Sequence, residues 1–316
     1  MPSHNQGSLY RDRIFGGDDT PPKQPATKPT TAMSTSSNNN EGYPFNRDAL
    51  ASTRLNLQHQ LFINSTGYHL HSKIAVPQNA LVADIGCGTG IWSMEVAKQL
   101  PVGSKVEAYD LSLAQTPPKQ WWPSNVTFAQ SDIFADIPAD LQGRYDVVNI
   151  RLFMCVIQSL DPMPLLRNLM KLLKPGGYLQ WQEYDPVTDK AICADPNASA
   201  PKLEALRAMI RGPAGDQAHI LEKHWVPHLH TRFAEAGGAL MAHEKVWTPM
   251  EYITIKQDVT FLAVREWIAN MRVKDPGSEG AAKLEKMVSE VEEECWNSQR
   301  GTFADSEIVT WIVRKN

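Results

Sequence analysis

A glycine-rich turn between an apolar run and a helical pattern constrains the fold more than any other feature. Residues 81–85 read Leu-Val-Ala-Asp-Ile, which is typical of a buried strand, and Gly86, Gly88 and Gly90 follow at once. Glycine permits a tight turn and lets a ligand lie against backbone amides, because it has no Cβ. One such turn can also be purely structural. A strand that passes through it into a helix predicts the first unit of a parallel α/β sheet.

Short apolar runs and helical patterns alternate along the chain after this turn. Such alternation is typical of parallel strands joined by helices. The expected strands are residues 81–85, 105–109, 126–130, 145–150 and 178–181, and two of the expected helices are residues 91–100 and 165–173. Further strand-like runs at 240–247 and 308–314 flank a helical region at 251–296 and would complete the sheet.

Composition and periodicity divide the chain into five parts. Residues 1–41 are rich in Pro, Thr, Ser and Asn and bury too little to offset the entropy of ordering, so we expect a disordered tail. A helical pattern at 48–62 predicts an N-terminal helical lid within residues 42–80. The remaining expected parts are an α/β core at 81–186, a helical cap at 187–239 with helices at 202–211 and 228–236, and the completion of the sheet with inserted helices at 240–316.

Charge and cysteine content exclude several classes of function. The net charge of −4 and the pI near 6.1 give no basic surface for nucleic acid. The four cysteines include no Cys-x-x-Cys pair, which argues against a disulfide framework and a structural zinc site. His224 and His228 have the i, i+4 spacing of a metal pair, but Pro227 interrupts the pattern, and we expect no metal. No run has the pattern of a signal peptide or a membrane span, which predicts a cytoplasmic protein without a membrane partner.

Two acidic residues follow neighbouring strands at the expected carboxyl edge of the sheet. Asp110 comes 20 residues after Gly90, where a carboxylate can accept hydrogen bonds from both ribose hydroxyls. Asp132 follows the next strand and could accept from an adenine amino group, while the amide of Ile133 addresses the ring. Either aspartate could instead be only a turn or helix cap. Together with the glycine turn they describe one crevice shaped for a nucleoside.

The spacing of the glycines favours a ligand without phosphate. The chain has Gly-x-Gly-x-Gly, whereas the dinucleotide fingerprint places its third glycine one position later, to admit a pyrophosphate at the helix N-terminus. That later position is occupied by Ile91. Hydride transfer with NAD, and binding of FAD, are therefore disfavoured.

Several motifs occur in a fixed order along residues 81–185. They are Val-Ala-Asp-Ile-Gly-Cys-Gly-Thr-Gly at 82–90, Asp110, Ser-Asp-Ile at 131–133, Tyr-Asp-Val-Val at 145–148, and Leu-Lys-Pro-Gly-Gly-Tyr at 173–178. In this order they resemble the class I S-adenosylmethionine-dependent methyltransferases. Residues 41–45, 54–59, 149–151 and 180–184 extend the similarity to methyltransferases of fungal secondary-metabolite pathways, including gliotoxin-type N-methyltransferases and relatives of the global regulator of such pathways.

The resemblance implies a fold and a cofactor. The implied fold is α/β, with a Rossmann-like, mostly parallel seven-stranded sheet whose last strand is antiparallel, an N-terminal helical lid and a helical cap insertion. The implied cofactor is S-adenosylmethionine, with Asp84 near its amino acid end, Asp110 at its ribose and Asp132 at its adenine.

Residues outside the glycine turn would complete the cofactor site. On the resemblance, Tyr43, Gln58, His59 and Arg151 could close over the methionine moiety or the acceptor. Alternatively, they belong to a structural helix and an exposed arginine. The full expected set of cofactor-binding residues is Tyr43, Gln58, Asp84, Gly86, Cys87, Gly88, Gly90, Asp110, Leu111, Asp132, Ile133 and Arg151.

Methyl transfer from a sulfonium requires alignment of donor and acceptor and exclusion of water more than covalent machinery. A base helps where the acceptor must lose a proton. Glu183, at the end of the fifth strand, and His228, where the cap begins, are the candidate catalytic residues. The alternatives are a partnered carboxylate at a strand end and a solvated cap residue.

The favoured function is methyl transfer to N or O of a small molecule, aromatic or peptide-derived. A cofactor-binding regulator without turnover remains open, as does a cyclase that uses the sulfonium as a fixed charge. Methylation of DNA amino groups is disfavoured, because Asn149-Ile150-Arg151 lacks the Pro-Pro-aromatic run expected there. The identity of the acceptor and the oligomeric state are left open.

Overall fold

The computed structural model describes residues 45–157, 160–211 and 224–316 of the chain. The predicted tail at 1–41 and the predicted cofactor residue Tyr43 lie outside these residues.

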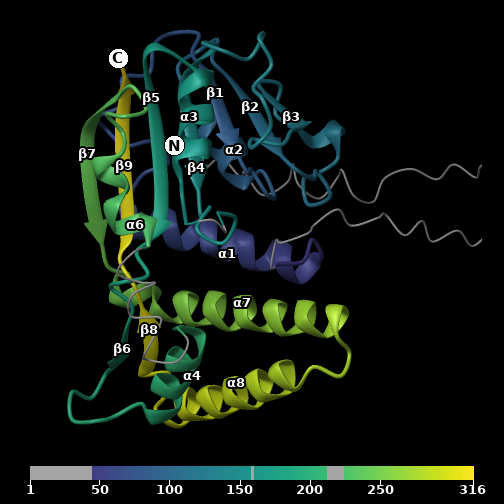
Figure 1. Cartoon of the computed structure of the whole chain (residues 1–316), viewed down its shortest axis with the longest axis vertical. Helices are drawn as coiled ribbons and strands as arrows, with labels where there is room; N and C mark the ends of the chain where they lie inside the picture. The colour runs from purple at the N-terminus through teal and green to yellow at the C-terminus, as the bar shows by residue number, and fades with distance from the viewer. Residues whose placement is uncertain (1–44, 158–159, 212–223) are drawn as a thin grey trace, which may run out of the picture. The chain divides into compact units, whose positions relative to one another are not determined.

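A central sheet carries the fold (Figure 1). Its strands are β1 (Leu81–Ile85), β2 (Lys105–Asp110), β3 (Val126–Gln130), β4 (Tyr145–Arg151), β5 (Leu173–Tyr184), β7 (Gly238–Val246) and β9 (Ile308–Lys315). They form one seven-stranded sheet in the order β3-β2-β1-β4-β5-β9-β7. Only β9 runs antiparallel to its neighbours, β5 and β7. The Rossmann-like fold class and its antiparallel last strand are thereby confirmed.

The buried strands explain why the sheet has two covered faces. Along β1, Val82 enters a core with Trp92 and Val96 of the helix α2 (Ile91–Val96). Its neighbours Ala83 and Ile85 point into a second core, which contains the helix α3 (Met163–Leu172). Successive side chains of a strand face opposite sides, so a strand with apolar residues on both faces requires a covering helix on each side.

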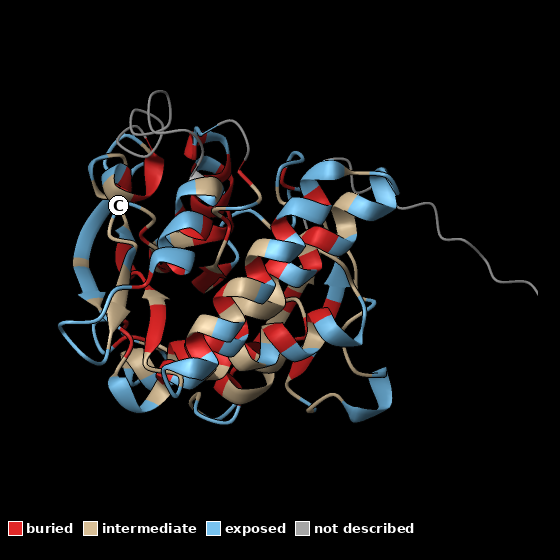
Figure 2. Ribbon diagram, turned by 90° about the horizontal axis from the view of Figure 1, so that it is seen from below, coloured by how far each residue is buried: buried red, intermediate tan, exposed pale blue. Residues whose placement is uncertain are grey.

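Four helices lie outside this sheet core. They are α1 (Ala49–Thr66), α4 (Pro201–Arg211), α7 (Ile253–Lys274) and α8 (Glu279–Asn297). Asp48 caps α1 by accepting from the Ala51 amide at 2.9 Å, and Gly67 ends it with φ of +84°. The helix α1 packs on α7, while α4, α7 and α8 share an apolar core. Both long helices carry buried and exposed residues (Figure 2); those of α8 form a one-sided apolar stripe, whereas α7 packs on both α1 and α8.

The helices α4, α7 and α8 form a layer beside the sheet. This helical layer includes more of the chain than the predicted cap at 187–239. It contains α7 and α8 and is edged by a two-stranded sheet of β6 (Lys190–Cys193) and β8 (Thr302–Asp305). At 228–236 a continuous helix is replaced by the short helix α6 (Trp225–His228), the 3-10 turn η2 (Leu229–Thr231) and further turns. Trp225, Leu229 and Phe233 are buried in the sheet core, so packing on the sheet determines this segment's path.

Two further short 3-10 turns are η1 (Lys119–Trp121) and η3 (Met250–Tyr252). Among the described residues, no helix combines the length and the apolar character needed to span a lipid bilayer.

Candidate functional site

A cavity of about 530 Å³ lies at the carboxyl ends of the parallel strands. The ends of β1, β2, β4 and β5 and the residues after β3 form one wall, and α1 and α7 supply the other. Figure 1 shows both helices beyond that edge of the sheet. A crevice at the carboxyl ends of the strands is where open α/β sheets bind ligands, and its volume lies within the usual range for small molecules.

The sequence-predicted site residues separate into two groups. The cavity is lined by Gln58, Asp84, Gly86, Cys87, Gly88, Asp110, Leu111, Asp132, Ile133, Arg151 and Glu183. Gly90 and His228 are absent from the lining, and His228 is exposed at the end of α6. The structure therefore does not bring the two predicted catalytic residues together.

The glycine turn adopts backbone angles that other residues rarely accept. Gly86 has φ of +70° and Gly88 has φ of +55°. A Cβ on Gly86 would lie 2.5 Å from Cε2 of Phe153. Gly90 also has a positive φ, and a Cβ there would overlap the ring of Phe128 in the core. Gly86 and Gly88 therefore keep the turn open beside the cavity, while Gly90 serves the packing at the start of α2.

The Asp110 carboxylate ties the glycine turn to the end of β2. Its Oδ2 accepts from the Gly88 amide at 2.9 Å, and its Oδ1 accepts from the Ser112 amide at 3.1 Å. Each carboxylate oxygen can accept more than one hydrogen bond, so both can still receive ribose hydroxyls. Asp132 is exposed, and its Oδ1 accepts from the Phe134 amide at 2.9 Å. It forms a local turn and lines the cavity at the same time.

Asp84 is a buried carboxylate at the end of β1. Its Oδ2 accepts from Ser93 Oγ at 2.5 Å, and its Oδ1 accepts from Asn149 Nδ2 at 2.9 Å. Burial raises the pKa of Asp84, and the two hydrogen bonds oppose that rise. Arg151, across the same end of the cavity, has its pKa lowered to about 10 by burial, while Asp84 and Glu95 attract its charge. This end of the cavity thus offers one carboxyl group and one guanidinium, which suit the ammonium and the carboxylate of an amino acid.

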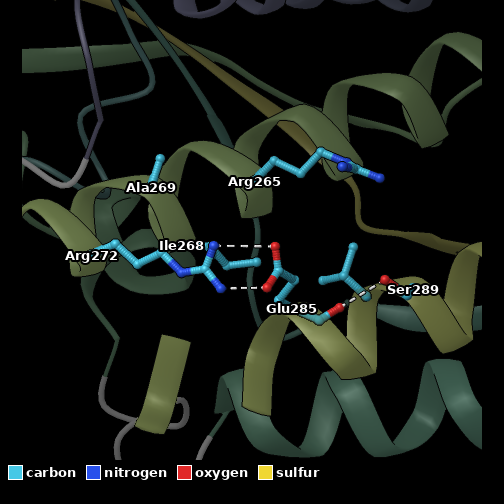
Figure 3. A pocket seen from close by; sticks show the side chains of 7 residues that line it. Arg265, Ile268, Ala269, Arg272, Glu285 and Ser289 are labelled. Carbon is cyan, nitrogen blue, oxygen red and sulfur yellow. Dashed lines mark hydrogen bonds and ion pairs between the residues drawn. The ribbon is translucent and has the colours of Figure 1, made fainter. Parts of the chain in front are cut away.

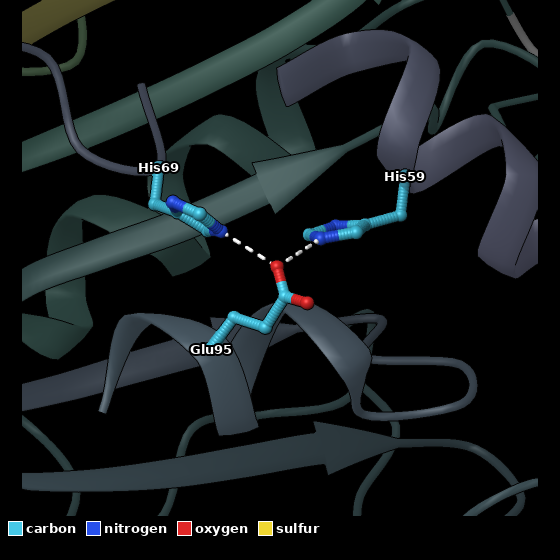
Figure 4. Close-up of side chains that lie close together, drawn as sticks. All are labelled: His59, His69 and Glu95. Carbon is cyan, nitrogen blue, oxygen red and sulfur yellow. Dashed lines mark hydrogen bonds and ion pairs between the residues drawn. The ribbon is translucent and has the colours of Figure 1, made fainter. Parts of the chain in front are cut away.

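His59, His69 and Glu95 form a cluster beside Arg151 (Figure 4). Both imidazoles lie 2.8 Å from the same Oε2 of Glu95 through their Nε2 atoms. Nδ1 of His59 accepts from Arg151 Nη2 at 3.2 Å, so the proton of the neutral ring is on Nε2 and points at Glu95. Burial, and then the charge of Arg151, lower the pKa of His59 to about 4.

The same three residues have the composition of a metal-binding set, with ligand atoms within 4.8 Å of one another. A metal on Nε2 of His59 would move the ring proton to Nδ1, where it would face the N–H of Arg151. Metal-bound histidines normally donate from that nitrogen to an acceptor. The positions of the ring protons therefore favour a hydrogen-bonded network over a metal site. This network connects α1 with Arg151. Sequence reasoning named His59 but did not include Glu95 or connect His69 with it.

Glu183 is completely buried at the end of β5 and holds the loop after β4. Its Oε1 accepts from the Phe153 amide and from Trp181 Nε1, each at 2.7 Å, and its Oε2 accepts from the Met154 amide at 3.3 Å. Burial raises its pKa to about 8, against the effect of these three donors. The residue before this loop, Leu152, has φ of +61°, so the loop needs such support. Glu183 therefore lines the cavity as a carboxyl group whose two oxygens are already partnered.

Of the helical wall of the cavity, sequence reasoning anticipated Gln58 and His59 on α1 but no residue of α7. On α1, Arg54 is buried and its Nε and Nη2 donate to the two carboxylate oxygens of Glu266 on α7, at 2.6 and 3.3 Å. On α7, five lining residues are spaced as one helix face: Lys256, Val259, Thr260, Ala263 and Val264. That spacing is visible in the sequence, but it is equally typical of a helix packed on a core.

A second hollow of about 520 Å³ lies between α7 and α8 and is bordered by the ion pair of Arg272 with Glu285 (Figure 3). It contains none of the sequence-predicted site residues.

Known proteins match the part of the chain that contains β1 to β5 and the glycine turn. A family model described as a methyltransferase domain matches residues 58–241. The chain is 33% identical over 140 residues to the methyltransferase grgD of a Penicillium species, which is 42% of this chain and 48% of that protein. It is 36% identical over 102 residues to the secondary metabolism regulator laeA of Coprinopsis cinerea, or 32% of this chain and 24% of that protein. The chain spans about half the length, or less, of these curated relatives.

A solved structure also matches this chain, at a lower sequence identity than the two proteins above. It is a SAM-dependent methyltransferase from Thiobacillus denitrificans in complex with S-adenosyl-L-homocysteine, 15% identical, with a TM-score of 0.43 over 87% of this chain and 94% of that chain.

Proposed function

Because the chain belongs to the methyltransferase domain family, we propose that it transfers a methyl group from S-adenosylmethionine to N or O of a small-molecule acceptor. The observation that carries the proposal is the single cavity at the strand ends, which Gly88, Asp110 and Arg151 line together. The similarity to grgD, described as a methyltransferase, agrees with it.

The residues of the cavity fit this cofactor. The glycine turn leaves no Cβ between the backbone and a nucleoside, and Asp110 retains acceptor capacity for ribose hydroxyls. Asp132 and Ile133 follow β3 at the expected adenine end. Asp84 and Arg151 would hold the ammonium and carboxylate of the methionine moiety. No phosphate-binding feature is required by this assignment.

When bound, S-adenosylmethionine supplies an electrophilic methyl group; the C–S bond breaks as a C–N or C–O bond forms, and a neutral thioether is left. The chain's part is to orient the two reactants and to exclude water. The helices α1 and α7 provide the cover over the strand ends. Glu183 acts through the loop at Phe153 and Met154, which it holds with both carboxylate oxygens. His228 has no role in this proposal, because it does not line the cavity.

The protein is proposed to work in the cytoplasm, on a small molecule and not on nucleic acid. Its net charge of −4 gives no attraction to a phosphate backbone. All four cysteines are free thiols, as expected in a reducing compartment: Cys87, Cys155, Cys193 and Cys295.

Turnover tests the proposal. The purified protein is incubated with S-adenosylmethionine carrying an isotopically labelled methyl group and with a fungal metabolite extract, and products are followed by mass spectrometry. We expect a labelled product together with S-adenosylhomocysteine. Replacement of Asp110 by Asn should reduce both, whereas replacement of the exposed Asp140, outside the cavity lining, by Asn should not.

A regulatory role is the second candidate, because laeA, described as a regulator, is 36% identical over its matched part. Tight binding of S-adenosylhomocysteine without any labelled product from the extract would favour that role. An isomerised product with unchanged cofactor would instead indicate a cyclase. Absence of cofactor binding would contradict all three functions.

A further inference from the structure

Two buried polar groups lie together at one end of the cavity, and one of them lacks a hydrogen-bond partner. Lys256 of α7 is 6% exposed, and its Nζ forms an ion pair with Asp305 Oδ1 at 3.7 Å, which is longer than a normal hydrogen bond. Oη of Tyr184, at the end of β5, is buried and has no hydrogen-bond partner within the described part of the chain. Both residues line the cavity. Buried polar groups are almost always satisfied, so an unmet hydroxyl beside a loosely paired ammonium is a sign of a missing ligand.

Lys256 and Tyr184 are in direct contact on the cavity wall. Nζ of Lys256 sits 3.6 Å from the centre of the Tyr184 ring, over its face. The Oη atom belongs to that ring, so one ligand oxygen placed at its edge can reach both donors. Asp305 does not fill this position, because its Oδ1 stays 3.7 Å from Lys256 Nζ while Oδ1 and Oδ2 are held by Thr248 Oγ1 and N at 2.9 and 3.2 Å.

The charge at this end suits an anion. Burial lowers the pKa of Lys256 to about 8, while Asp305 and Asp189 act to raise it, and the ammonium form is still the main one at neutral pH. Glu183, on the neighbouring part of β5, has its pKa raised to about 8 by burial and would carry little charge to oppose a bound anion. Arg54 is neutralised by its ion pair with Glu266. Arg151 also acts on Tyr184 but is assigned to the carboxylate of the methionine moiety, so Lys256 is the cation left for an acceptor here.

The surface beside the two donors is apolar. Val259, Ala263 and Val264 continue the face of α7 on which Lys256 stands. Met154 and Val156, from the loop that Glu183 holds, line the same cavity. A pocket with an apolar wall and a few fixed polar groups binds an apolar body and orients it by one polar end.

We propose that this end of the cavity binds the acceptor as an apolar molecule with one anionic oxygen, a carboxylate or an ionised phenol, which accepts hydrogen bonds from Lys256 Nζ and Tyr184 Oη. The inference rests on the proposed function, because it assigns the substrate class of the same cavity. A purely structural Lys256, retained only as the partner of Asp305, would affect folding but would not distinguish an acid from its neutral analogue.

The test compares two probes of nearly equal shape, 1-naphthoate and 1-naphthamide. Their dissociation constants are measured by ligand-detected NMR on the full chain, with and without saturating S-adenosylhomocysteine. We expect the acid to bind at least tenfold more tightly than the amide. The variant Lys256→Met should abolish this preference, whereas Lys274→Met, on an exposed residue at the end of the same helix, should retain it.

The variant Tyr184→Phe keeps the test valid if Lys256→Met does not fold. It removes an unpartnered hydroxyl, so its unfolding midpoint should not fall, while its affinity for the acid should decrease several-fold. Equal affinity for the two probes, no binding of naphthoate, or an acid preference that survives in the folded Lys256→Met variant would each overturn the inference. Failure of the proposed function has a separate readout, since it would appear as the absence of any labelled product in the turnover assay, whether or not S-adenosylhomocysteine binds in calorimetry.

Discussion

The ion pair between Arg54 and Glu266 allows a quantitative test of how the lid is held. Nε and Nη2 of Arg54 donate to both oxygens of Glu266, and Nη1 donates to Gln58 Oε1 at 3.1 Å. The side chain of Glu266 is 1% exposed. Replacing Arg54 by Met would therefore leave a buried carboxylate without its cation. Breaking a buried pair in this way costs about 3–5 kcal/mol of the free energy of unfolding.

The assay is urea denaturation of single and double variants at pH 7. Replacing both residues, by Arg54→Met and Glu266→Leu, removes the unpaired charge together with its partner and should restore stability to within about 1 kcal/mol of the original protein. The pair of Arg272 with Glu285 is the matched control, because it also involves α7 but its side chains are 45% and 52% exposed. Its disruption by Arg272→Met should cost no more than about 1 kcal/mol.

The pH dependence adds a second check. Burial already raises the pKa of Glu266, and loss of Arg54 removes the opposing effect of a cation. A carboxyl whose folded pKa lies above its unfolded pKa stabilises the folded state only while it is protonated, so the loss in Arg54→Met should be smaller at pH 5 than at pH 8. The reasoning is refuted if the single variant loses less than the Arg272 control, or if the double variant is no more stable than Arg54→Met.

Three further predictions concern the cavity. Asp110→Asn should weaken S-adenosylhomocysteine binding by about 1–3 kcal/mol, because charge-assisted hydrogen bonds to the ribose become neutral ones; an unchanged calorimetric affinity would contradict the placement of the ribose. Gly86→Ala should cost about 1–2 kcal/mol of stability for its backbone angle alone and more for the overlap with Phe153. The control Gly143→Ala has φ of +61° and nothing within 4 Å of the new Cβ, so equal losses in denaturation would show that the overlap is harmless. Burial lowers the pKa of His59 from 6.5 to about 4 in the folded protein. As the pH falls, His59 is therefore protonated in the unfolded chain before it is protonated in the folded protein. The free energy of unfolding should drop by about 3 kcal/mol between pH 7 and pH 4. His59→Gln should lack that part of the drop, and parallel pH profiles of the two proteins would rule the assignment out.

Sequence reasoning succeeded where the signal is local. The turn at Gly86 and Gly88 lies directly after a buried strand, and Asp110 comes at the end of the next one. Parallel strands joined by helices bring their carboxyl ends to the same edge, so three short segments sufficed to locate the cavity.

It did less well where a residue's role depends on distant partners. Glu183 was placed at the correct strand end, but its hydrogen bonds to Phe153 and Trp181 show that it supports a loop. His228 was chosen for its residue type and its position where the cap was predicted to begin. The packing of Trp225 and Leu229 on the sheet leaves it exposed instead, outside the cavity lining.

The amino-acid sequence by itself determined the order of strands and helices, the glycine turn and the acidic residues at the strand ends. These depend on periodicity and on backbone geometry within a few residues. Only the tertiary structure decided that Lys256 meets Tyr184, 72 positions earlier in the chain, and that His59 shares Glu95 with His69. Such contacts depend on how α1 and α7 pack across the strand ends, and desolvation and pairing there set the charge of each group.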